Sequence, residues 1–258
     1  MNALERFGLA GKTAVITGGA RGIGYAVAEL CAQAGADIAI IDVLAEQAEE
    51  SAKAIVKATG RKAFAFGADL ADATAARAVV DETHGTLGRI DVLMNCVGIG
   101  PNTKVLDIPA EEWAQVMNVN VNAQFYVGQA VARKMADAGG GSIVAIGSNS
   151  GFIVDRPQPQ AHYNASKAAV HQMVKSMAIE LAPKNIRVNA VAPGYVITEM
   201  TKRGMSNPEW LDIWVEATPM GRLGKPEEIA NVMVFLASDA ASYMTGSIVL
   251  ADGGYTCW

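Results

Sequence analysis

A tyrosine and a lysine four residues apart, with a serine on the segment before them, are the residues best suited to proton transfer. Tyr163 and Lys167 fall on one face of a helix, because residues four apart are neighbours there. A lysine cation favours a nearby phenolate, so Lys167 is expected to lower the pKa of Tyr163 from its ordinary value of about 10. Ser148 precedes them on a loop and could hold a substrate oxygen. The three side chains predict a site that moves a proton to or from an alcohol.

Such a pair is also common on helix surfaces, so the surrounding elements must decide whether it forms a site. Strands are expected at residues 13–17, 37–41, 62–66, 90–95, 142–146, 186–192 and 247–250, and helices at residues 25–34, 44–59, 72–86, 109–135, 165–181 and 226–238. This alternation predicts an α/β fold with residues 1–258 in a single domain. We expect a Rossmann-type, doubly wound parallel sheet of about seven strands, with helices on both faces and ligands at the carboxyl ends of the strands.

A glycine-rich turn separates the first expected strand from the first expected helix. It reads Gly18-Gly-Ala-Arg-Gly-Ile-Gly24. Glycines let the backbone turn tightly and let a pyrophosphate approach the helix N-terminus, where the helix dipole favours an anion. Its position directly after a strand is typical of a dinucleotide-binding unit.

The second expected strand ends close to Asp42, which lies 18 residues after Gly24. An acidic side chain near this distance accepts a hydrogen bond from the adenosine ribose and repels a 2′-phosphate. Asp42 therefore predicts NAD rather than NADP. Arg21, inside the glycine turn, indicates the opposite, because a guanidinium could face a 2′-phosphate. We give Asp42 more weight, since its repulsion of the phosphate is direct.

Composition and charge exclude several other classes of protein. The net charge is −5 with dispersed basic residues, which gives no nucleic-acid-binding surface. No apolar run reaches the ~18 residues of a membrane span, and the N-terminus lacks the order of a signal peptide. The three cysteines and three histidines have no disulfide or metal-ligand spacing. We therefore expect no metal site, no membrane partner and a reducing, cytoplasmic location.

Two segments have unusual local patterns. Residues 195–222 contain no strand pattern and are long for a connection in a compact domain, so we expect a substrate-binding lid with short helices of its own. Asn118, Asn120 and Asn122 lie inside the helix expected at residues 109–135, although asparagine is a poor helix former. At least one of them should have a buried partner or distort the helix.

Together these features resemble the short-chain dehydrogenase/reductase family over essentially the whole chain. The motifs that carry the resemblance are Thr17-Gly-x-x-x-Gly-x-Gly24, Asp69, Asn95-x-x-Gly98, Asn120, Ser148, Tyr163-x-x-x-Lys167 and Pro193-Gly194. The resemblance implies an NAD-dependent oxidoreductase acting on CH–OH groups, commonly a homotetramer. In it Tyr163 would take the hydroxyl proton, Lys167 would lower its pKa, Ser148 would hold the substrate oxygen, and Asn120 would anchor a relay water.

The cofactor contacts that the resemblance implies come from the glycine turn, the ends of several strands, the active-site helix and the start of the lid. They are Gly18, Arg21, Ile23, Asp42, Asp69, Leu70, Asn95, Gly98, Tyr163, Lys167, Pro193, Gly194, Val196 and Thr198.

The segment between Ser148 and Tyr163 departs from the common family pattern. The two residues are 15 positions apart, which is longer than the usual spacing, and residues 155–160 absorb the difference. This segment is similar to that of polyol dehydrogenases of the galactitol and arabinitol type, which interconvert sugar alcohols and ketoses. The implied substrate-binding residues are Ser148, Asn149, Ser150, Asp155, Gln158, Tyr163 and Tyr195. Hydrogen bonds inside the loop would explain the serine, asparagine and aspartate residues equally well.

Two other functions are compatible with the same fold. A 3-oxoacyl thioester reductase, or another secondary-alcohol/ketone reductase, would prefer NADPH, and the former would need a basic patch for an acidic carrier protein. Asp42 and the net charge of −5 speak against both features. A non-enzymatic cofactor-binding protein could lose Ser148, Tyr163 or Lys167 without penalty, yet all are present. A small-molecule polyol or ketose is therefore the expected partner.

Overall fold

The computed structural model describes residues 4–258 except the side chain of Arg203, so residues 1–3 of the predicted domain lie outside the described residues. Its strands form one seven-stranded parallel sheet in the order β3-β2-β1-β4-β5-β6-β7. The strands are β1 (Thr13–Thr17), β2 (Asp37–Asp42), β3 (Ala63–Gly67), β4 (Val92–Asn95), β5 (Gly141–Ile146), β6 (Ile186–Pro193) and β7 (Ile248–Ala251). The predicted parallel sheet of about seven strands is confirmed.

Within residues 4–258, nine α-helices and one π-helix connect and cover the strands. They are α1 (Gly22–Gln33), α2 (Ala45–Thr59), α3 (Ala73–Leu87), α4 (Ala110–Met117), η2 (Asn118–Asn122, the π-helix), α5 (Ala123–Asp137), α6 (Ala161–Leu181), α7 (Glu199–Met205), α8 (Pro208–Ala217) and α9 (Pro226–Ala237). Short 3-10 turns lie at Glu5–Phe7, Asn149–Gly151, Ala182–Lys184, Asp239–Ala241 and Tyr255–Cys257.

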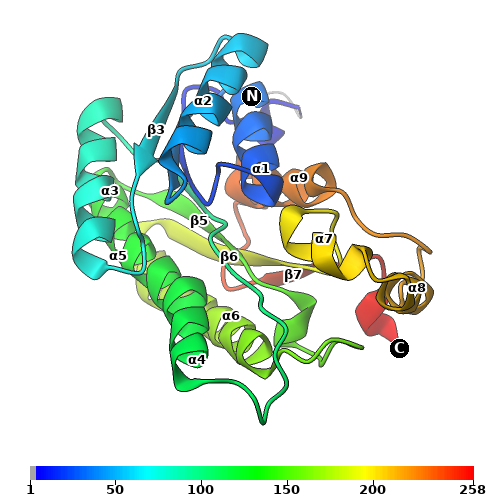
Figure 1. Ribbon diagram of the computed structural model, residues 1–258. Helices are drawn as coiled ribbons and strands as arrows, with labels where there is room; N and C mark the ends of the chain where they lie inside the picture. Colours follow the sequence, from blue (N-terminus) through cyan, green and yellow to red (C-terminus); the bar gives the residue numbers. More distant parts are fainter. Residues whose placement is uncertain (1–3) are drawn as a thin grey trace.

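The sheet is covered on both faces, as Figure 1 shows. One hydrophobic cluster joins the sheet to α1, α2 and α9, and the other joins it to α3, α5 and α6. Strand β2 contributes side chains to both hydrophobic clusters. Ile38 and Ile40 belong to the first cluster, whereas Ala39 and Ile41 belong to the second. Alternate side chains of a strand point to opposite faces, so a strand buried on both faces is apolar throughout.

The order of the strands reverses between β1 and β4, which both neighbour the centre of the sheet. In an open parallel sheet, this switch point opens a crevice beyond the carboxyl ends of the strands. The glycine turn follows β1, the active-site serine follows β5, and the segment of residues 195–222 follows β6. All three therefore meet at the same edge of the sheet.

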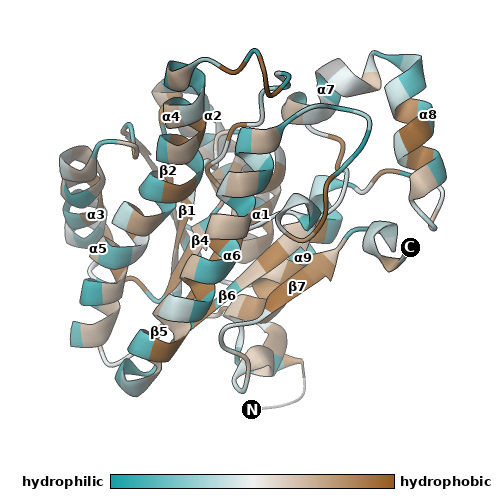
Figure 2. Ribbon diagram, turned by 90° about the horizontal axis from the view of Figure 1, so that it is seen from below, coloured by the Kyte–Doolittle hydropathy of each residue, from teal (hydrophilic) through white to brown (hydrophobic). Residues whose placement is uncertain are grey.

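Element boundaries differ from the predicted ones at two places that matter for the site. The helix expected at residues 109–135 is divided into α4 and α5 by the π-helix at Asn118–Asn122, which confirms the expected distortion. Helix α6 begins at Ala161, four residues earlier than predicted, so Tyr163 lies in its first turn. Residues 195–222 contain the two helices α7 and α8, and Figure 2 shows them projecting from the layered body on the side of the C-terminus.

Candidate active site

Helix α6 holds Tyr163 and Lys167 against the carboxyl end of β5. Lys167 Nζ donates to the carbonyl oxygen of Ile146, the last residue of β5, at 3.1 Å, and lies 5.5 Å from the centre of the Tyr163 ring. The ring packs on Gly100, where an added Cβ would lie 3.3 Å from two ring carbons. The tyrosine and lysine thus lie together at the carboxyl end of β5 and are not a pair on the helix surface.

Burial governs the protonation of both groups. It raises the pKa of Tyr163 to about 12, and a hydrogen bond with Ser148 acts in the opposite direction. Burial also lowers the pKa of Lys167 to about 8. The pKa of Tyr163 is therefore raised overall, because burial disfavours the phenolate more than the hydrogen bond with Ser148 favours it. That Lys167 lowers this pKa stays a prediction.

Ser148 is fixed by the backbone and side chains of its own loop. Its Oγ accepts from the backbone N–H of Ser150 at 3.2 Å, and its single proton can be donated to Ser150 Oγ at 3.0 Å or to Asn149 Oδ1 at 3.2 Å. A hydrogen bond also joins it to Tyr163. The structure therefore brings Ser148, Tyr163 and Lys167 together as predicted.

His171 packs against the loop that holds Ser148. This residue was not identified from the sequence. It lies one turn beyond Lys167 on α6, and its Nε2 accepts from the backbone N–H of Ser148 at 3.5 Å. The ring lies so close to Gly147 and Gly151 that an added Cβ at either would come within 2.5 Å of it. Burial lowers the pKa of His171 to about 4, which keeps the ring neutral. Its position eight residues after Tyr163, on the same helix face, is the signal that could have indicated it.

Asn120 is the buried asparagine of the π-helix. Its Oδ1 accepts from the backbone N–H of Ile99 at 2.8 Å, and its Nδ2 donates to the Ile99 carbonyl and to Ser166 Oγ, both at 2.9 Å. The side chain therefore fixes the loop after β4 beside α6. Both amide hydrogens are used inside the protein, so the anchoring of a relay water by Asn120 stays a prediction.

The glycine turn has the close backbone contacts that a pyrophosphate site needs. An added Cβ on Gly24 would lie 2.0 Å from the carbonyl oxygen of Gly18. Gly18 has a φ of +65°, which favours glycine, and its Cβ position is 3.1 Å from the backbone nitrogen of Val97. An added Cβ on Gly22 would lie 3.8 Å from the side chain of Thr198, so the start of the predicted lid borders the turn.

Asp42 closes the other side of this turn. Its carboxylate accepts from the backbone N–H of Ala20 and of Leu44, both at 3.0 Å. Each carboxylate oxygen retains a further lone pair for a ribose hydroxyl. Arg21 is exposed at the start of α1, and Ile23 is partly buried beside the core. The turn, Asp42 and the helix N-terminus fit the adenosine half of a nicotinamide cofactor.

The remaining predicted cofactor residues lie at the same edge of the sheet but differ in their accessibility. Asn95 is buried and its amide is used by Thr17 Oγ1 and the Gln124 carbonyl. Leu70 belongs to the core, whereas Asp69 is exposed and accepts from the backbone N–H of Ala71. The other four sit at the end of β6 or beside Lys167: Pro193, Gly194, Val196 and Gly98. The side chains of Asn95 and Leu70 are thus engaged inside the protein, and their contact with a cofactor stays a prediction.

The predicted substrate residues separate into two groups. Asn149, Ser150 and Asp155 are buried beside Ser148, and Ser150 donates to Asp155. Asn149 Nδ2 and Asp155 Oδ1 are buried with no hydrogen-bond partner among residues 4–258. These two atoms, one donor and one acceptor, therefore have unused hydrogen-bonding capacity in the loop that holds Ser148.

Gln158 and Tyr195 form the second group and bind each other. Gln158 Nε2 donates to the Tyr195 hydroxyl at 2.6 Å, and Gln158 Oε1 accepts from Trp214 Nε1 at 3.0 Å. The Tyr195 ring stacks on Trp214 with centroids 4.1 Å apart, and its hydroxyl donates to the Arg156 carbonyl. Gln158 and Tyr195 therefore connect residues 155–160 to α8. These contacts account for both side chains without a bound substrate.

His162 is fully buried and pairs with Glu112 of α4 through Nε2 at 2.9 Å, while its Nδ1 accepts from the backbone N–H of Tyr163. His162 thus joins α6 to α4 through a buried hydrogen bond. No group of three or more metal-ligating side chains gathers anywhere in the described part of the chain.

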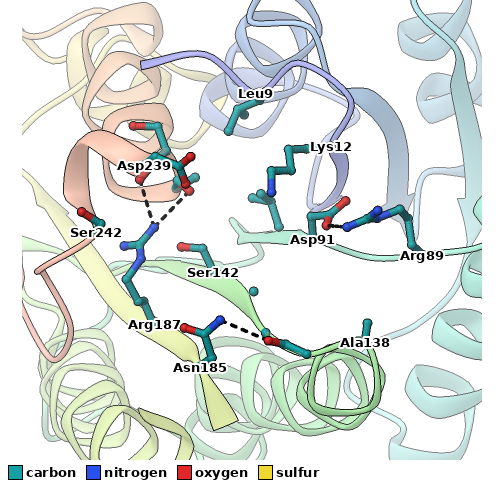
Figure 3. A pocket seen from close by; sticks show the side chains of 16 residues that line it. Leu9, Lys12, Arg89, Asp91, Ala138, Ser142, Asn185, Arg187, Asp239 and Ser242 are labelled. Carbon is teal, nitrogen blue, oxygen red and sulfur yellow. Dashed lines mark hydrogen bonds and ion pairs between the residues drawn. The ribbon is translucent and has the colours of Figure 1, made fainter. Parts of the chain in front are cut away.

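A cavity of about 320 Å³ lies at the opposite edge of the sheet, at the amino ends of β1, β4, β5 and β6. Figure 3 shows two of its arginines engaged within the protein. Arg89 pairs with Asp91, and Arg187 donates to the carbonyl oxygens of Ala237 and Ser238 at the end of α9. The cavity therefore lies at the edge of the sheet remote from Tyr163.

Sequence comparison places the chain in a known family. Residues 18–256 match the protein-family model described as Enoyl-(Acyl carrier protein) reductase. Galactitol 2-dehydrogenase (L-tagatose-forming) of Cereibacter sphaeroides is 42% identical over 98% of both chains. D-arabinitol 2-dehydrogenase (ribulose-forming) of Scheffersomyces stipitis is 38% identical over 100% of this chain and 98% of that protein. The chain belongs to the short-chain dehydrogenase/reductase family and is an oxidoreductase.

Solved structures agree with this assignment. The crystal structure of gox2181 has a TM-score of 0.97 and 44% identity, covering 99% of both chains. A gluconate 5-dehydrogenase of Burkholderia cenocepacia was solved with NADP, with a TM-score of 0.95, 35% identity and full coverage of both chains. A 7α-hydroxysteroid dehydrogenase was solved with NADH. It has a TM-score of 0.93 and 35% identity, covering 98% of both chains. The family thus binds NAD(P), and the neighbours include both forms.

Proposed function

We propose that this chain is an NAD-dependent dehydrogenase that interconverts a secondary alcohol of a polyol and the corresponding ketose. The observation that carries the proposal is the pair of buried, unpartnered polar atoms beside Ser148, Asn149 Nδ2 and Asp155 Oδ1. A donor and an acceptor in the loop that holds Ser148 suit a substrate with several hydroxyl groups, because each hydroxyl both donates and accepts. The names of the galactitol and arabinitol relatives support the same substrate class.

In the reaction, the protein manages the proton and the position of the substrate. The bound nicotinamide supplies hydride acceptance and return. Tyr163 removes the hydroxyl proton in oxidation and returns it in reduction, and Ser148 holds the substrate oxygen beside the phenol. Because burial holds the pKa of Tyr163 near 12, the phenol is protonated at neutral pH and ready to donate to a ketone.

The choice of NAD rests on Asp42. Its carboxylate is held at the edge of the glycine turn by the N–H groups of Ala20 and Leu44, so it faces the same crevice as the turn. A 2′-phosphate there would meet direct repulsion. Arg21 is the observation that favours NADP.

The substrate-binding lid is the second part of the proposal. Met200 of α7 lies near the Tyr163 ring, since its sulfur is 3.5 Å from the Cβ position of Gly100 against which the ring packs. Thr198 borders the glycine turn. The segment of residues 195–222 therefore spans from the proposed cofactor site to the catalytic tyrosine, and its opening would admit the polyol.

A homotetramer is the proposed assembly. Two sets of large apolar side chains are exposed on this chain: Trp113 and Phe125 on α4 and α5, and Tyr243, Leu250 and Trp258 around the edge strand β7. Two distinct apolar faces are what a subunit needs to contact more than one copy. A monomer by light scattering would contradict the proposal. The cytoplasmic location stays a prediction; the cysteines Cys31, Cys96 and Cys257 are free, and no described helix has the length and apolar character of a membrane span.

A 3-oxoacyl thioester reductase is the second candidate. The reductase FabG of Chlamydia trachomatis is 38% identical over 95% of this chain and 98% of that protein, and Arg21 would suit its NADPH. The polar wall beside Ser148 and the net charge of −5 favour the polyol.

One assay separates the two candidates. Initial rates of NADH or NADPH formation are measured with galactitol, D-arabinitol, a simple secondary alcohol and a 3-hydroxyacyl thioester, each with NAD and with NADP. We expect the highest kcat/KM for a polyol with NAD. Turnover of the thioester without turnover of any polyol would overturn the proposal.

A further inference from the structure

A line of hydrogen bonds runs from Ser148 through Ser150 to Oδ2 of Asp155, the carboxylate oxygen that the proposed substrate contact does not use. Ser148 Oγ donates to Ser150 Oγ at 3.0 Å, and Ser150 Oγ donates to Oδ2 of Asp155. The Gln160 amide touches the same two groups, at 3.4 Å from Ser150 Oγ and 3.3 Å from Asp155 Oδ2. Asp155 is only 5% exposed. The carboxylate is therefore shielded from water and two hydrogen bonds away from the serine that holds the substrate oxygen.

The numbers of donors and acceptors fix the direction of this line. An ionised carboxylate only accepts, so the single hydroxyl proton of Ser150 is directed to Asp155. Ser150 Oγ then accepts from Ser148, and Asn149 Oδ1 at 3.2 Å is the alternative acceptor for the same proton. While Asp155 is ionised and the phenol of Tyr163 keeps its proton, the Ser148 proton is thus directed into the protein, to Ser150 or Asn149. Toward the substrate, Ser148 presents a lone pair.

Protonation of Asp155 reverses the line. A carboxylic acid can donate to Ser150, which can then donate to Ser148, and the Ser148 proton is released toward the substrate oxygen. The two substrates of a dehydrogenase respond differently to this change. An alcohol brings its own hydroxyl proton and can donate to the serine, whereas a ketone only accepts and needs donors from the protein.

We propose that Asp155 is a positioning residue that determines, through Ser150, whether Ser148 accepts a hydrogen bond from the bound alcohol or donates one to the bound ketone. The ionised acid favours the alcohol and the neutral acid favours the ketone. This inference rests on the proposed function, because it requires Ser148 to contact the reacting oxygen.

The surroundings of Asp155 favour the protonated, neutral form of its carboxyl group. Burial raises the pKa of Asp155, the charge of Asp252 raises it further, and the hydrogen bonds from Ser150 and Gln160 act against the rise. The other ionisable groups that interact with it are Tyr163 and Tyr195, which bring no positive charge. Its Oδ1 is buried without a partner among residues 4–258, which also penalises the ionised form. Affinity for the ketone should therefore increase as the pH falls through this raised pKa.

The test compares KM for galactitol with NAD and KM for L-tagatose with NADH from about pH 5 to pH 9, in wild type and three variants. The variant Asp155→Asn has no charge, and its amide can donate to Ser150. We expect its KM for the ketone to be about fivefold lower than that of wild type on the alkaline side, with little dependence on pH. Asp137→Asn makes the same chemical change at an exposed position on α5 and should leave both constants unchanged.

The variant Ser150→Ala separates the hydrogen-bonded line from a simple effect of charge. It keeps the carboxylate of Asp155 but removes the link to Ser148. We expect the pH dependence of the ketone KM to disappear in this variant too. If Ser150→Ala keeps the wild-type pH dependence, or if Asp155→Asn leaves the ratio of the two KM values unchanged, the inference is wrong.

Two controls keep the outcome decisive. Thermal unfolding and NADH binding, measured by fluorescence, show whether each variant is folded, and Ser150→Ala decides alone if Asp155→Asn does not fold. D-arabinitol and ribulose replace galactitol and L-tagatose if wild type prefers them. A wild type that oxidises no polyol overturns the proposed function together with this inference, whereas an active wild type with an unchanged KM ratio overturns the inference alone.

Discussion

The β1–α1–β2 region and the β5–α6–β6 region place their functional groups at the same edge of the sheet by different means. Around the glycine turn, close backbone contacts determine the geometry: Gly24 leaves no room for a Cβ beside the Gly18 carbonyl, and Asp42 is fixed by two backbone N–H groups. Around Ser148, buried side chains determine it, through the bonds to Ser150 and the His171 ring.

This difference explains how one family can keep its cofactor and change its substrate. Backbone geometry suits pyrophosphate, which every member must bind, and a single added methyl group disrupts it. A network of side chains can be altered one residue at a time without changing the fold. The predictions below test whether the two regions can be disturbed separately.

The largest effect is expected for Tyr163→Phe. Removal of the hydroxyl should lower kcat by about 10²- to 10⁴-fold, the usual contribution of a positioned acid–base group. The phenylalanine ring retains the packing on Gly100, so NADH binding should remain close to that of wild type. Steady-state kinetics and a fluorescence titration measure the two quantities. Near-normal turnover would remove Tyr163 from the mechanism.

The pH dependence of alcohol oxidation should reflect the same group. Burial raises the pKa of Tyr163 to about 12, and oxidation requires the deprotonated form. The rate should therefore increase with pH, by about tenfold per unit while the phenol is protonated. The hydrogen bond from Ser148 opposes the rise in pKa, so Ser148→Ala should move the profile to higher pH as well as lower the rate. A profile that falls with increasing pH would contradict this assignment.

Gly24→Ala should disturb the first region without touching the second. Its Cβ would lie 2.0 Å from the Gly18 carbonyl oxygen, so the turn must shift. We expect a loss of about 1–3 kcal/mol in the free energy of unfolding and weaker NADH binding. Gly85→Ala in α3 is the matched control, because nothing lies within 4 Å of its Cβ position. It should be neutral or more stable by about 0.5–1 kcal/mol. Urea unfolding measures both, and equal effects would contradict the steric argument.

Asp42→Ala should change cofactor preference while leaving the chemistry at Tyr163 intact. Loss of the carboxylate removes its repulsion of a 2′-phosphate, so the ratio of kcat/KM for NAD over NADP should fall by roughly 10- to 100-fold. Asp42→Asn tests charge alone, since its amide oxygen can still accept from Ala20 or Leu44. A ratio that neither variant changes would assign cofactor choice to another residue.

The smallest effect is expected for Gln158→Leu. The variant loses the hydrogen bonds to Trp214 and Tyr195 that fasten residues 155–160 to α8. The KM for the polyol should rise about fivefold, as for the loss of a net hydrogen bond, with a smaller change in kcat. Gln47→Leu, on the exposed side of α2, is the control. If KM for the polyol is unaffected, Gln158 does not hold the lid in its binding position.

The glycine turn and Tyr163 with Lys167 could be predicted because each depends on local sequence. Glycine has conformations that other residues avoid, and residues four apart on a helix lie on one face. The distortion at Asn120 was also predictable, because asparagine is unfavourable in a helix interior without a partner. The identity of that partner, Ile99, was not, since it lies in another loop.

The sequence by itself determined the alternation of strands and helices, the dinucleotide-binding turn and the acid–base pair, all of which follow from periodicity and short spacing. Only the tertiary structure decided the protonation of the active-site groups and the hydrogen-bond partners of the predicted substrate residues. It showed that burial raises the pKa of Tyr163, and that Gln158 and Tyr195 bind each other. The physical reason is that desolvation and hydrogen-bond partners depend on groups brought together from distant parts of the chain, which no local pattern encodes.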